Sequence, residues 1–221
     1  LEFVDGLSLA KVAYRAQAAG VALSPAIVGH VVRSVLRGLE HAHASHVLHR
    51  DVCPQNVLVS RAGDVKLGDF GIARVLDHTG EGASTRTIAG HEAYMAPEQI
   101  EGRPLSYVTD LFAVGVIAWE LLTGKRLFAR DNVAATLLAV TRAPVALARG
   151  IRPDLSPAWD ELLARALARP AAARFASARE MLAALDAIDE ARGDAASALG
   201  ELVVLLAAGA VPRAAREDDH T

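Results

Sequence analysis

The sequence has 221 residues, enough for one domain with a sizeable core, and its hydrophobic fraction of 52% excludes an intrinsically disordered chain. A formal net charge of -3 and the lack of any long Lys/Arg run argue against a nucleic-acid partner. Cys53 is the single cysteine, which excludes an internal disulfide framework and favours a reducing, cytoplasmic location.

No signal peptide opens the chain, and its longest apolar run, at 202–211, is well short of the roughly 20 residues that span a bilayer. No membrane segment is therefore expected in this sequence. The opening residues LEFVDG are typical of a strand that runs straight into a loop. We therefore expect the chain to begin inside a larger protein.

A helix is predicted from 24 to 46, because Ser24 can cap it, Pro25 suits its first turn and apolar residues recur at helical spacing. Two short β-type runs follow, NVLVS and VKLGD, and Gly63 between them permits a tight turn, so they predict a hairpin. Residues 72–94 show no period and are rich in glycine and hydroxyl side chains, which predicts a long functional loop.

The segment 109–124 is apolar on nearly every side, which predicts a central, buried helix. Amphipathic helices are expected near 131–142, 156–168 and 177–192. An Ala-rich helix, packed on the domain rather than on a partner, and a charged, frayed tail are expected beyond Gly193. The predicted fold class is mainly α with a small β-hairpin.

The stretch HRDVCPQN at 49–56 contains an aspartate, Asp51, and an asparagine, Asn56, separated by four residues. Phosphoryl transfer needs a carboxylate near the acceptor hydroxyl and oxygen ligands that hold Mg²⁺ against the phosphates. The predicted hairpin brings the chain back, so that Asp69 in DFG at 69–71 lies beside this loop. The three side chains together predict a phosphoryl-transfer centre.

Four motifs in order make the sequence resemble the eukaryotic-type (Hanks-type) serine/threonine protein kinases of bacteria. They are HRDVCPQN, DFGIAR, YMAPEQ at 94–99 and TDLFAVGVIAWELLTG at 109–124, and Arg174 follows in RPAAARF. The resemblance implies that residues 1–190 are the hinge and C-terminal lobe of a kinase domain, and that 191–221 are a C-terminal extension.

The same resemblance implies that the ATP γ-phosphate is transferred to serine or threonine of a protein substrate, with Mg²⁺ as the metal and Mn²⁺ as an alternative. Self-association for autophosphorylation is left open. Asp51 matches the catalytic base, and Asn56 and Asp69 match the metal ligands. His49 and Phe70 match the buried residues that join the catalytic loop to the metal loop, of which Gly71 is also part.

Other positions match residues that support or regulate this centre. Glu98 matches a glutamate that pairs with an arginine, here Arg174, and Asp110 matches the helix residue that holds the catalytic loop from beneath. Arg50 and Arg74 are candidate docking residues for a phosphorylated loop. The candidate phosphorylation sites are Ser84, Thr85 and Thr87, although loop hydroxyls are often simply solvated.

The opening residues resemble the hinge that binds adenine. Leu1 would be the gatekeeper, and the backbone of Glu2 and Val4 would meet the adenine edges. Leu58 would lie under the adenine ring, and Gln55 is expected at the same cofactor site.

The motifs that such kinases place before the hinge, a GxGxxG loop and a VAIK-like strand, do not occur in this sequence. We therefore expect the chain alone to be inactive or very weak. Two positions also depart from the family pattern: Cys53 replaces a lysine that touches the transferred phosphate, and His91 replaces a threonine that links that lysine to the base. The paired change affects the expected rate of phosphoryl transfer, not the class of protein to which the sequence is assigned.

Two other functions are weighed against a kinase. The first is a non-catalytic, pseudokinase-like binding module or remnant, against which Asp51, Asn56 and Asp69 argue. The second is an aminoglycoside-type small-molecule phosphotransferase, against which the APE motif argues. Two smaller alternatives are a histidine-rich metal site at 41–49 and a redox switch at Cys53, whose thiol pKa a neighbouring arginine would lower.

Overall fold

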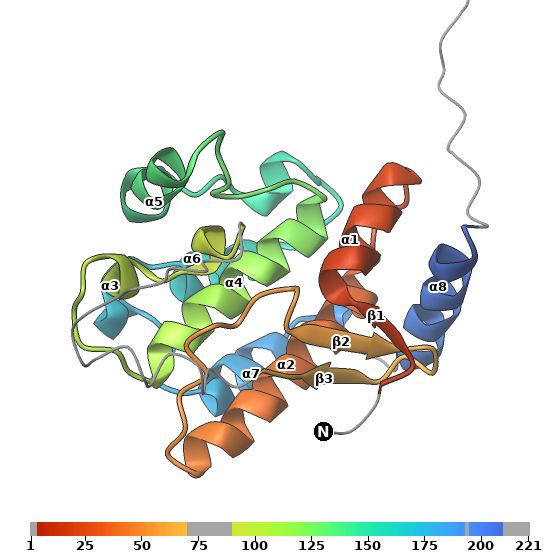
Figure 1. Ribbon diagram of the computed structural model, residues 1–221, viewed down its shortest axis with the longest axis horizontal. Helices are drawn as coiled ribbons and strands as arrows, with labels where there is room; N and C mark the ends of the chain where they lie inside the picture. The colour runs from red at the N-terminus through yellow and green to blue at the C-terminus, as the bar shows by residue number, and fades with distance from the viewer. Residues whose placement is uncertain (1–3, 70–89, 193–194, 210–221) are drawn as a thin grey trace, which may run out of the picture.

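The structure is a computed structural model, and it describes residues 4–69, 90–192 and 195–209. In these ranges helices predominate, and a small sheet packs near α1, α2 and α8 (Figure 1). The predicted fold class is confirmed. The helices are α1 (Leu9–Ala18), α2 (Pro25–Ala44), α3 (Pro97–Ile100), α4 (Tyr107–Thr123), α5 (Val133–Arg142), α6 (Pro157–Ala166), α7 (Ala178–Asp186) and α8 (Ala196–Ala208), and the strands are β1 (Gly6–Ser8), β2 (Val57–Ser60) and β3 (Val65–Leu67).

The predicted hairpin forms, with β2 antiparallel to β3 and Val57 opposite Leu67. A third strand that we did not predict, β1, pairs antiparallel with the other edge of β2, with Gly6 opposite Ser60. The strand expected at the start of LEFVDG falls partly on residues 1–3, which lie outside the described residues, whereas β1 follows it and leads directly into α1 through the helix cap Ser8.

The central helix α4 is buried on nearly every side, as its sequence predicts. It packs against α2, α6 and α7 and runs through the middle of the helical region (Figure 1). The helix α2 begins where predicted: the Ser24 hydroxyl accepts the Ile27 N–H at 3.2 Å, and Pro25 occupies the first turn. Asp110 of α4, which His43 of α2 contacts, holds the backbone of the loop at 49–56.

The predicted helix at 177–192 is shorter than expected, because α7 ends at Asp186 and a separate 3₁₀ turn follows at Asp189–Ala191. That turn packs on α2 at Gly29, where an added Cβ would lie 2.5 Å from the Ala191 carbonyl oxygen. The Arg33 guanidinium on α2 also donates to the Ala191 carbonyl oxygen at 3.0 Å. The contacts of this turn with α2 therefore explain why α7 ends at Asp186 and does not continue to 192.

The last helix, α8, packs on the domain, as the sequence analysis favoured. Leu199, Val203 and Leu206 are buried, and the hairpin turn lies against the first turns of the helix. The approach is close: an added Cβ at Gly200 would lie 2.6 Å from the Arg61 carbonyl oxygen. One face of the helix therefore belongs to the folded core, whereas Val204 and Leu205 are exposed.

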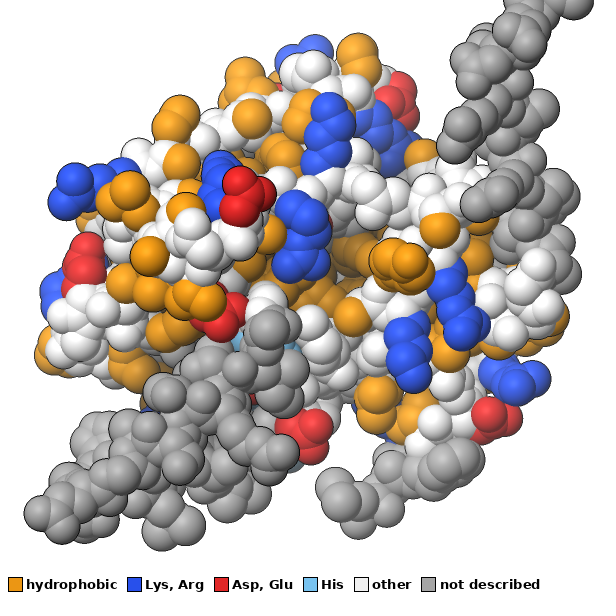
Figure 2. Space-filling view, turned by 45° about the horizontal axis from the view of Figure 1, so that its top comes forward, with side chains coloured by type: hydrophobic (Ala, Val, Ile, Leu, Met, Phe, Trp, Pro, Cys, Tyr) orange, Lys and Arg blue, Asp and Glu red, His pale blue; other side chains and the backbone are white. Residues whose placement is uncertain are grey.

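Among the described residues, no helix combines the length and apolar character that crossing a bilayer requires. The surface is hollowed between α1 and the end of α4, where hydrophobic side chains gather (Figure 2). This cavity has a volume of about 500 Å³, and Ala16, Leu23 and Leu121 are among its lining residues. Its described lining includes none of the predicted catalytic or metal-binding residues, so the size of a cavity does not locate the candidate site in this chain.

Candidate active site

The loop that carries Asp51 is held from beneath by Asp110, which is buried in the first turn of α4. One carboxylate oxygen of Asp110 accepts the backbone N–H of Arg50 at 2.8 Å, and the other accepts that of His49 at 3.0 Å. The buried His43 at the end of α2 also hydrogen-bonds to this carboxylate, at 2.8 Å. The predicted role of Asp110 is consistent with these contacts, whereas sequence reasoning missed His43, because a histidine at a helix end gives no local sign of its partner.

The imidazole of His49 joins this loop to the strand that precedes Asp69. Its Nε2 donates to the Gly68 carbonyl oxygen at 2.9 Å, and its Nδ1 accepts the Asp51 N–H at 3.4 Å, so both bonds require the Nε2–H tautomer. A backbone hydrogen bond of 2.8 Å from Gly68 N–H to the Asn56 carbonyl oxygen completes the link. The residue just before Asp69 is therefore bonded directly to the loop that carries Asp51 and Asn56.

Arg50 and Asp69 both have left-handed backbone conformations, with φ values of 65° and 52°. Such conformations cost free energy for residues with a side chain and persist where surrounding contacts enforce them. For Arg50 the contacts are with Asp110, through its N–H, and with Gln99, whose amide Nε2 donates to the Arg50 carbonyl oxygen at 2.9 Å. Gln99 lies in the motif YMAPEQ, which gives no local sign of this contact.

The Asn56 side chain is oriented by two hydrogen bonds. Its Nδ2 donates to the Asp51 backbone oxygen at 2.8 Å and to the Asp51 Oδ2 at 3.1 Å. Because both partners are oxygens, the amide nitrogen faces Asp51 and the amide oxygen remains for another partner. Asp69 is exposed, so its carboxylate is accessible. Amide and carboxylate oxygens are hard ligands that suit Mg²⁺, and the donor set therefore fits the expected metal.

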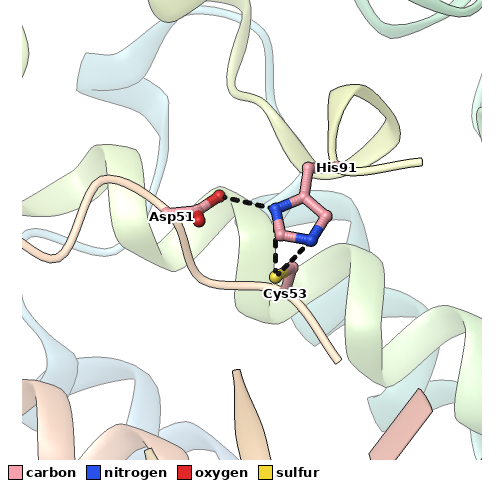
Figure 3. Close-up of side chains that lie close together, drawn as sticks. All are labelled: Asp51, Cys53 and His91. Atoms are coloured by element: carbon pink, nitrogen blue, oxygen red, sulfur yellow. Dashed lines mark hydrogen bonds and ion pairs between the residues drawn. The ribbon is translucent and has the colours of Figure 1, made fainter. Parts of the chain in front are cut away.

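The second carboxylate oxygen of Asp51 faces His91. Asp51 Oδ1 lies 3.1 Å from His91 Nδ1, and Cys53 Sγ lies 3.6 Å and 3.7 Å from the two ring nitrogens (Figure 3). Burial, followed by the charge of Asp51, raises the pKa of the Cys53 thiol to about 12. This is opposite to the lowering that the redox-switch alternative requires.

Glu98 in α3 and Arg174 form a buried ion pair. The Arg174 guanidinium donates to the two carboxylate oxygens at 2.7 Å and 2.8 Å. Burial of Glu98 opposes its ionisation, but the hydrogen bonds and charge of Arg174 outweigh this, so the pKa of the carboxyl lies below its ordinary value. The geometry agrees with the pairing implied by the family resemblance.

Two of the candidate adenine-binding residues lie in or beside the small sheet. Val4 comes just before β1, and Leu58 lies in β2 opposite Ser8 of β1 and Lys66 of β3. Gln55 lies between Asp51 and β2, with its amide oxygen buried. Several predicted residues lie outside the described part of the chain: Leu1, Glu2, Phe70, Gly71, Arg74, Ser84, Thr85 and Thr87.

Comparison with protein families places this geometry in a known context. The model of the protein kinase domain matches residues 1–185. This chain belongs to the protein kinase family. The match covers both the loop at 49–56 and the Glu98–Arg174 pair, so these lie within the kinase domain.

Bacterial kinases are similar to this family member over most of its length. Serine/threonine-protein kinase PknL of Mycobacterium tuberculosis is 40% identical over 168 residues, which are 76% of this chain and 42% of PknL. The probable serine/threonine-protein kinase PknB of Lactococcus lactis is 35% identical over 82% of this chain and 28% of its own length. Serine/threonine-protein kinase pkn3 of Myxococcus xanthus is 38% identical over 87% of this chain and 36% of its own length. The chain thus spans less than half of each of these relatives, and its resemblance to bacterial Hanks-type kinases is confirmed.

Proposed function

We propose that this chain supplies the hydroxyl-activating and metal-binding half of a protein serine/threonine kinase. One observation carries the proposal: Asp51 and Asn56 lie hydrogen-bonded to each other in one loop, and the residue before Asp69 is bonded to that loop. Asp110 fixes the backbone of the loop. The kinase relatives support serine or threonine of a protein as the acceptor.

In the proposed reaction, Asp51 orients the acceptor hydroxyl and takes its proton. The hydroxyl oxygen forms a bond to the γ-phosphorus of ATP while the bond from that phosphorus to the bridging oxygen breaks, and ADP leaves. The hydrogen bond from Asn56 Nδ2 holds the Asp51 carboxylate in one orientation. Preorganisation of this kind reduces the entropy that the transition state must lose.

Asn56, through its amide oxygen, and Asp69 would hold Mg²⁺, which when bound neutralises charge on the ATP phosphates. The hydrogen bond between Gly68 N–H and the Asn56 carbonyl oxygen keeps the backbones of these two segments side by side. Val4, Leu58 and Gln55, with Glu2, remain the proposed adenine side of the cofactor site.

Groups that grip the ATP phosphates in this family, a glycine-rich loop and a strand lysine, do not occur among these 221 residues. We therefore assign the complete reaction to a polypeptide that supplies them, with 1–190 as its hinge and C-terminal lobe and 191–221 as an extension. Without those groups, positioning and charge stabilisation of the phosphates are lost, and the rate should be very low.

Phosphorylation of Ser84, Thr85 or Thr87 is proposed to regulate this site by docking onto Arg50 and Arg74. The Arg50 Nε is buried without a hydrogen-bond partner among the described residues, which supports a role in receiving an anion. Replacing the three hydroxyl residues with alanine should lower the activity of the complete kinase. Unchanged activity and unchanged phosphate content would contradict this regulation.

The proposed function is tested by incubating the complete polypeptide with Mg²⁺ and ATP labelled at the γ-phosphate, together with protein acceptors. Label recovered as phosphoserine or phosphothreonine is the expected result. Label found only on small-molecule acceptors would overturn the protein-kinase assignment, and nucleotide binding without transfer would indicate a pseudokinase-like binding module.

A further inference from the structure

A cluster of three metal-ligand side chains lies at the catalytic loop, where Cys53 and His91 replace the lysine and threonine of the family pattern. Its members are Asp51, Cys53 and His91, whose ligand atoms all lie within 4.8 Å of one another (Figure 3). Cys53 is fully buried, and the His91 side chain is 10% exposed. The cluster brings together a thiol, an imidazole and a carboxylate, one from each of three ligand classes.

Two of the distances between the three groups are close to those of a tetrahedral zinc site, once the imidazole ring is allowed to turn. With typical Zn–S, Zn–N and Zn–O bond lengths, the sulfur-to-nitrogen edge of such a tetrahedron is about 3.5 Å and the nitrogen-to-oxygen edge about 3.3 Å. The corresponding distances here are 3.6 Å, from Cys53 Sγ to His91 Nδ1, and 3.1 Å, from His91 Nδ1 to Asp51 Oδ1. The sulfur and the carboxylate oxygen lie within 4.8 Å of each other. Because Cys53 Sγ is almost equally far from both ring nitrogens, at 3.6 Å and 3.7 Å, it faces the ring, and the imidazole has to turn before Nδ1 and the thiolate can bind the same ion.

The surroundings hold these ligands in place. Asn56 Nδ2 binds the Asp51 Oδ2 and leaves Oδ1 toward His91, as an outer-shell residue does at a metal site. The backbone carbonyl of Cys53 accepts the Asn56 N–H at 3.0 Å, which fixes the loop between them. His91 leads directly into the 3₁₀ turn Glu92–Tyr94. The ligands therefore come from backbone segments that are already ordered.

Space for a fourth ligand adjoins the cluster. A small cavity of about 10 Å³ is lined by Arg50, Asp51 and His91, among other residues. This is close to the minimum that one water molecule needs. Three protein ligands and a water are a common arrangement for zinc sites that keep one position open.

We propose that Asp51, Cys53 and His91 bind one soft divalent transition-metal ion of the Zn²⁺ type. Thiolate and imidazole ligands favour such ions over Mg²⁺, which prefers the oxygens of Asn56 and Asp69. The thiol releases its proton to solvent when the ion binds. The ligand types would thus direct the Zn²⁺-type ion to Cys53 and His91, and Mg²⁺ to the neighbouring oxygens.

Occupancy of this site has a consequence that rests on the proposed function. A carboxylate that coordinates Zn²⁺ is a much weaker base toward the acceptor hydroxyl, so the bound ion inhibits phosphoryl transfer. In this respect Cys53 and His91 make the catalytic aspartate sensitive to Zn²⁺.

The binding test uses Co²⁺ as a spectroscopic substitute for Zn²⁺, added to chelator-treated protein. One equivalent should produce a thiolate-to-cobalt charge-transfer band, and Zn²⁺ should displace it. Cys53→Ser should abolish the band, and His91→Gln should weaken binding by about tenfold to a hundredfold or more. His41→Gln changes an exposed histidine outside the cluster and should leave the band unchanged. Circular dichroism and thermal melting establish that each variant is folded.

No charge-transfer band in the folded wild-type protein would overturn the metal site, and so would a band that His91→Gln leaves intact. The cluster would then be a hydrogen-bonded packing arrangement only. Because this spectrum requires no catalysis, its outcome is independent of whether the proposed kinase function holds.

The inhibition test uses the complete kinase with saturating Mg²⁺–ATP and increasing Zn²⁺, and each variant is compared with its own rate in the absence of Zn²⁺. Wild type should lose activity at the concentrations that displace Co²⁺, whereas Cys53→Ser should need at least about tenfold more Zn²⁺. Equal sensitivity of the two proteins would overturn the inhibitory role. Absence of activity in both would contradict the proposed function, and the cobalt spectrum would still decide the metal site.

Discussion

Arg174 and Glu98 form a bidentate ion pair in which both side chains are almost completely shielded from solvent, with exposed fractions of 0% and 2%. Breaking such a pair leaves an uncompensated buried charge. Glu98→Gln should therefore lower the free energy of unfolding by about 3–5 kcal/mol, as measured by chemical denaturation. Glu101→Gln, at an exposed pair with Arg103, is the matched control and should cost less than about 1 kcal/mol.

The contribution of Glu98 should also depend on pH. The pKa of its carboxyl is lowered in the folded protein from an ordinary value of 4.5, because Arg174 outweighs the effect of burial. Its stabilisation is therefore complete above that ordinary value and is lost as pH falls through the lowered folded pKa. Denaturation curves between neutral and acid pH should show the difference between wild type and Glu98→Gln shrinking. A difference that grows toward acid pH would contradict the assignment.

Asp110 should control the shape of the catalytic loop. The N–H groups of His49 and Arg50 donate to different oxygens of Asp110, so in Asp110→Asn one of them faces an NH2 group and loses its acceptor. We expect a loss of about 1–3 kcal/mol in stability and faster hydrogen exchange at these two amides. Unchanged exchange at both amides would show that the loop keeps its conformation without the carboxylate.

Cys53 should be chemically inert in the folded, metal-free protein. Burial raises its thiol pKa to about 12, compared with 9.0 for an ordinary thiol. Near neutral pH this lowers the thiolate fraction by roughly 10³-fold. Alkylation by iodoacetamide should therefore be slow until denaturant is added, as followed by mass spectrometry. Rapid alkylation of the native protein would instead support the redox-switch alternative.

Packing of α8 on the hairpin should contribute to stability. In Gly200→Ala the new methyl group would lie 2.6 Å from the Arg61 carbonyl oxygen, so the helix must move. The cost of overpacking, about 1–3 kcal/mol, should exceed the gain of up to about 1 kcal/mol in helix propensity. Gly150→Ala, at a site with no neighbour within 4 Å of the added carbon, should change the melting temperature little.

Much of the helical fold could be predicted because its signals are local. Ser24 and Pro25 mark the start of α2, and the uniform apolar character of α4 indicates burial. By contrast, β1 is three residues long and is defined by pairing with β2, far along the chain. The end of α7 is likewise decided by the contact between Ala191 and Gly29. These features depend on tertiary contacts that a local pattern does not contain.

The candidate site divides in the same way. Asp51, Asn56 and Asp69 could be proposed as site residues because their spacing and order are typical of kinases. The sequence also showed that Cys53 and His91 depart from the family pattern, but not that both face Asp51. The contacts of His43 with Asp110 and of Gln99 with Arg50 arise only when separate segments fold together.

Phosphoryl transfer by the complete kinase carrying Asp51→Asn tests the central claim most directly. Asparagine keeps the shape of the side chain but cannot take the proton, so the rate should fall by about 10²–10⁴-fold with thermal stability nearly unchanged. Asp131→Asn, an exposed position outside the site, serves as the control and should retain the wild-type rate. A folded Asp51→Asn protein with wild-type transfer to serine or threonine would contradict the assignment of Asp51 as the catalytic base.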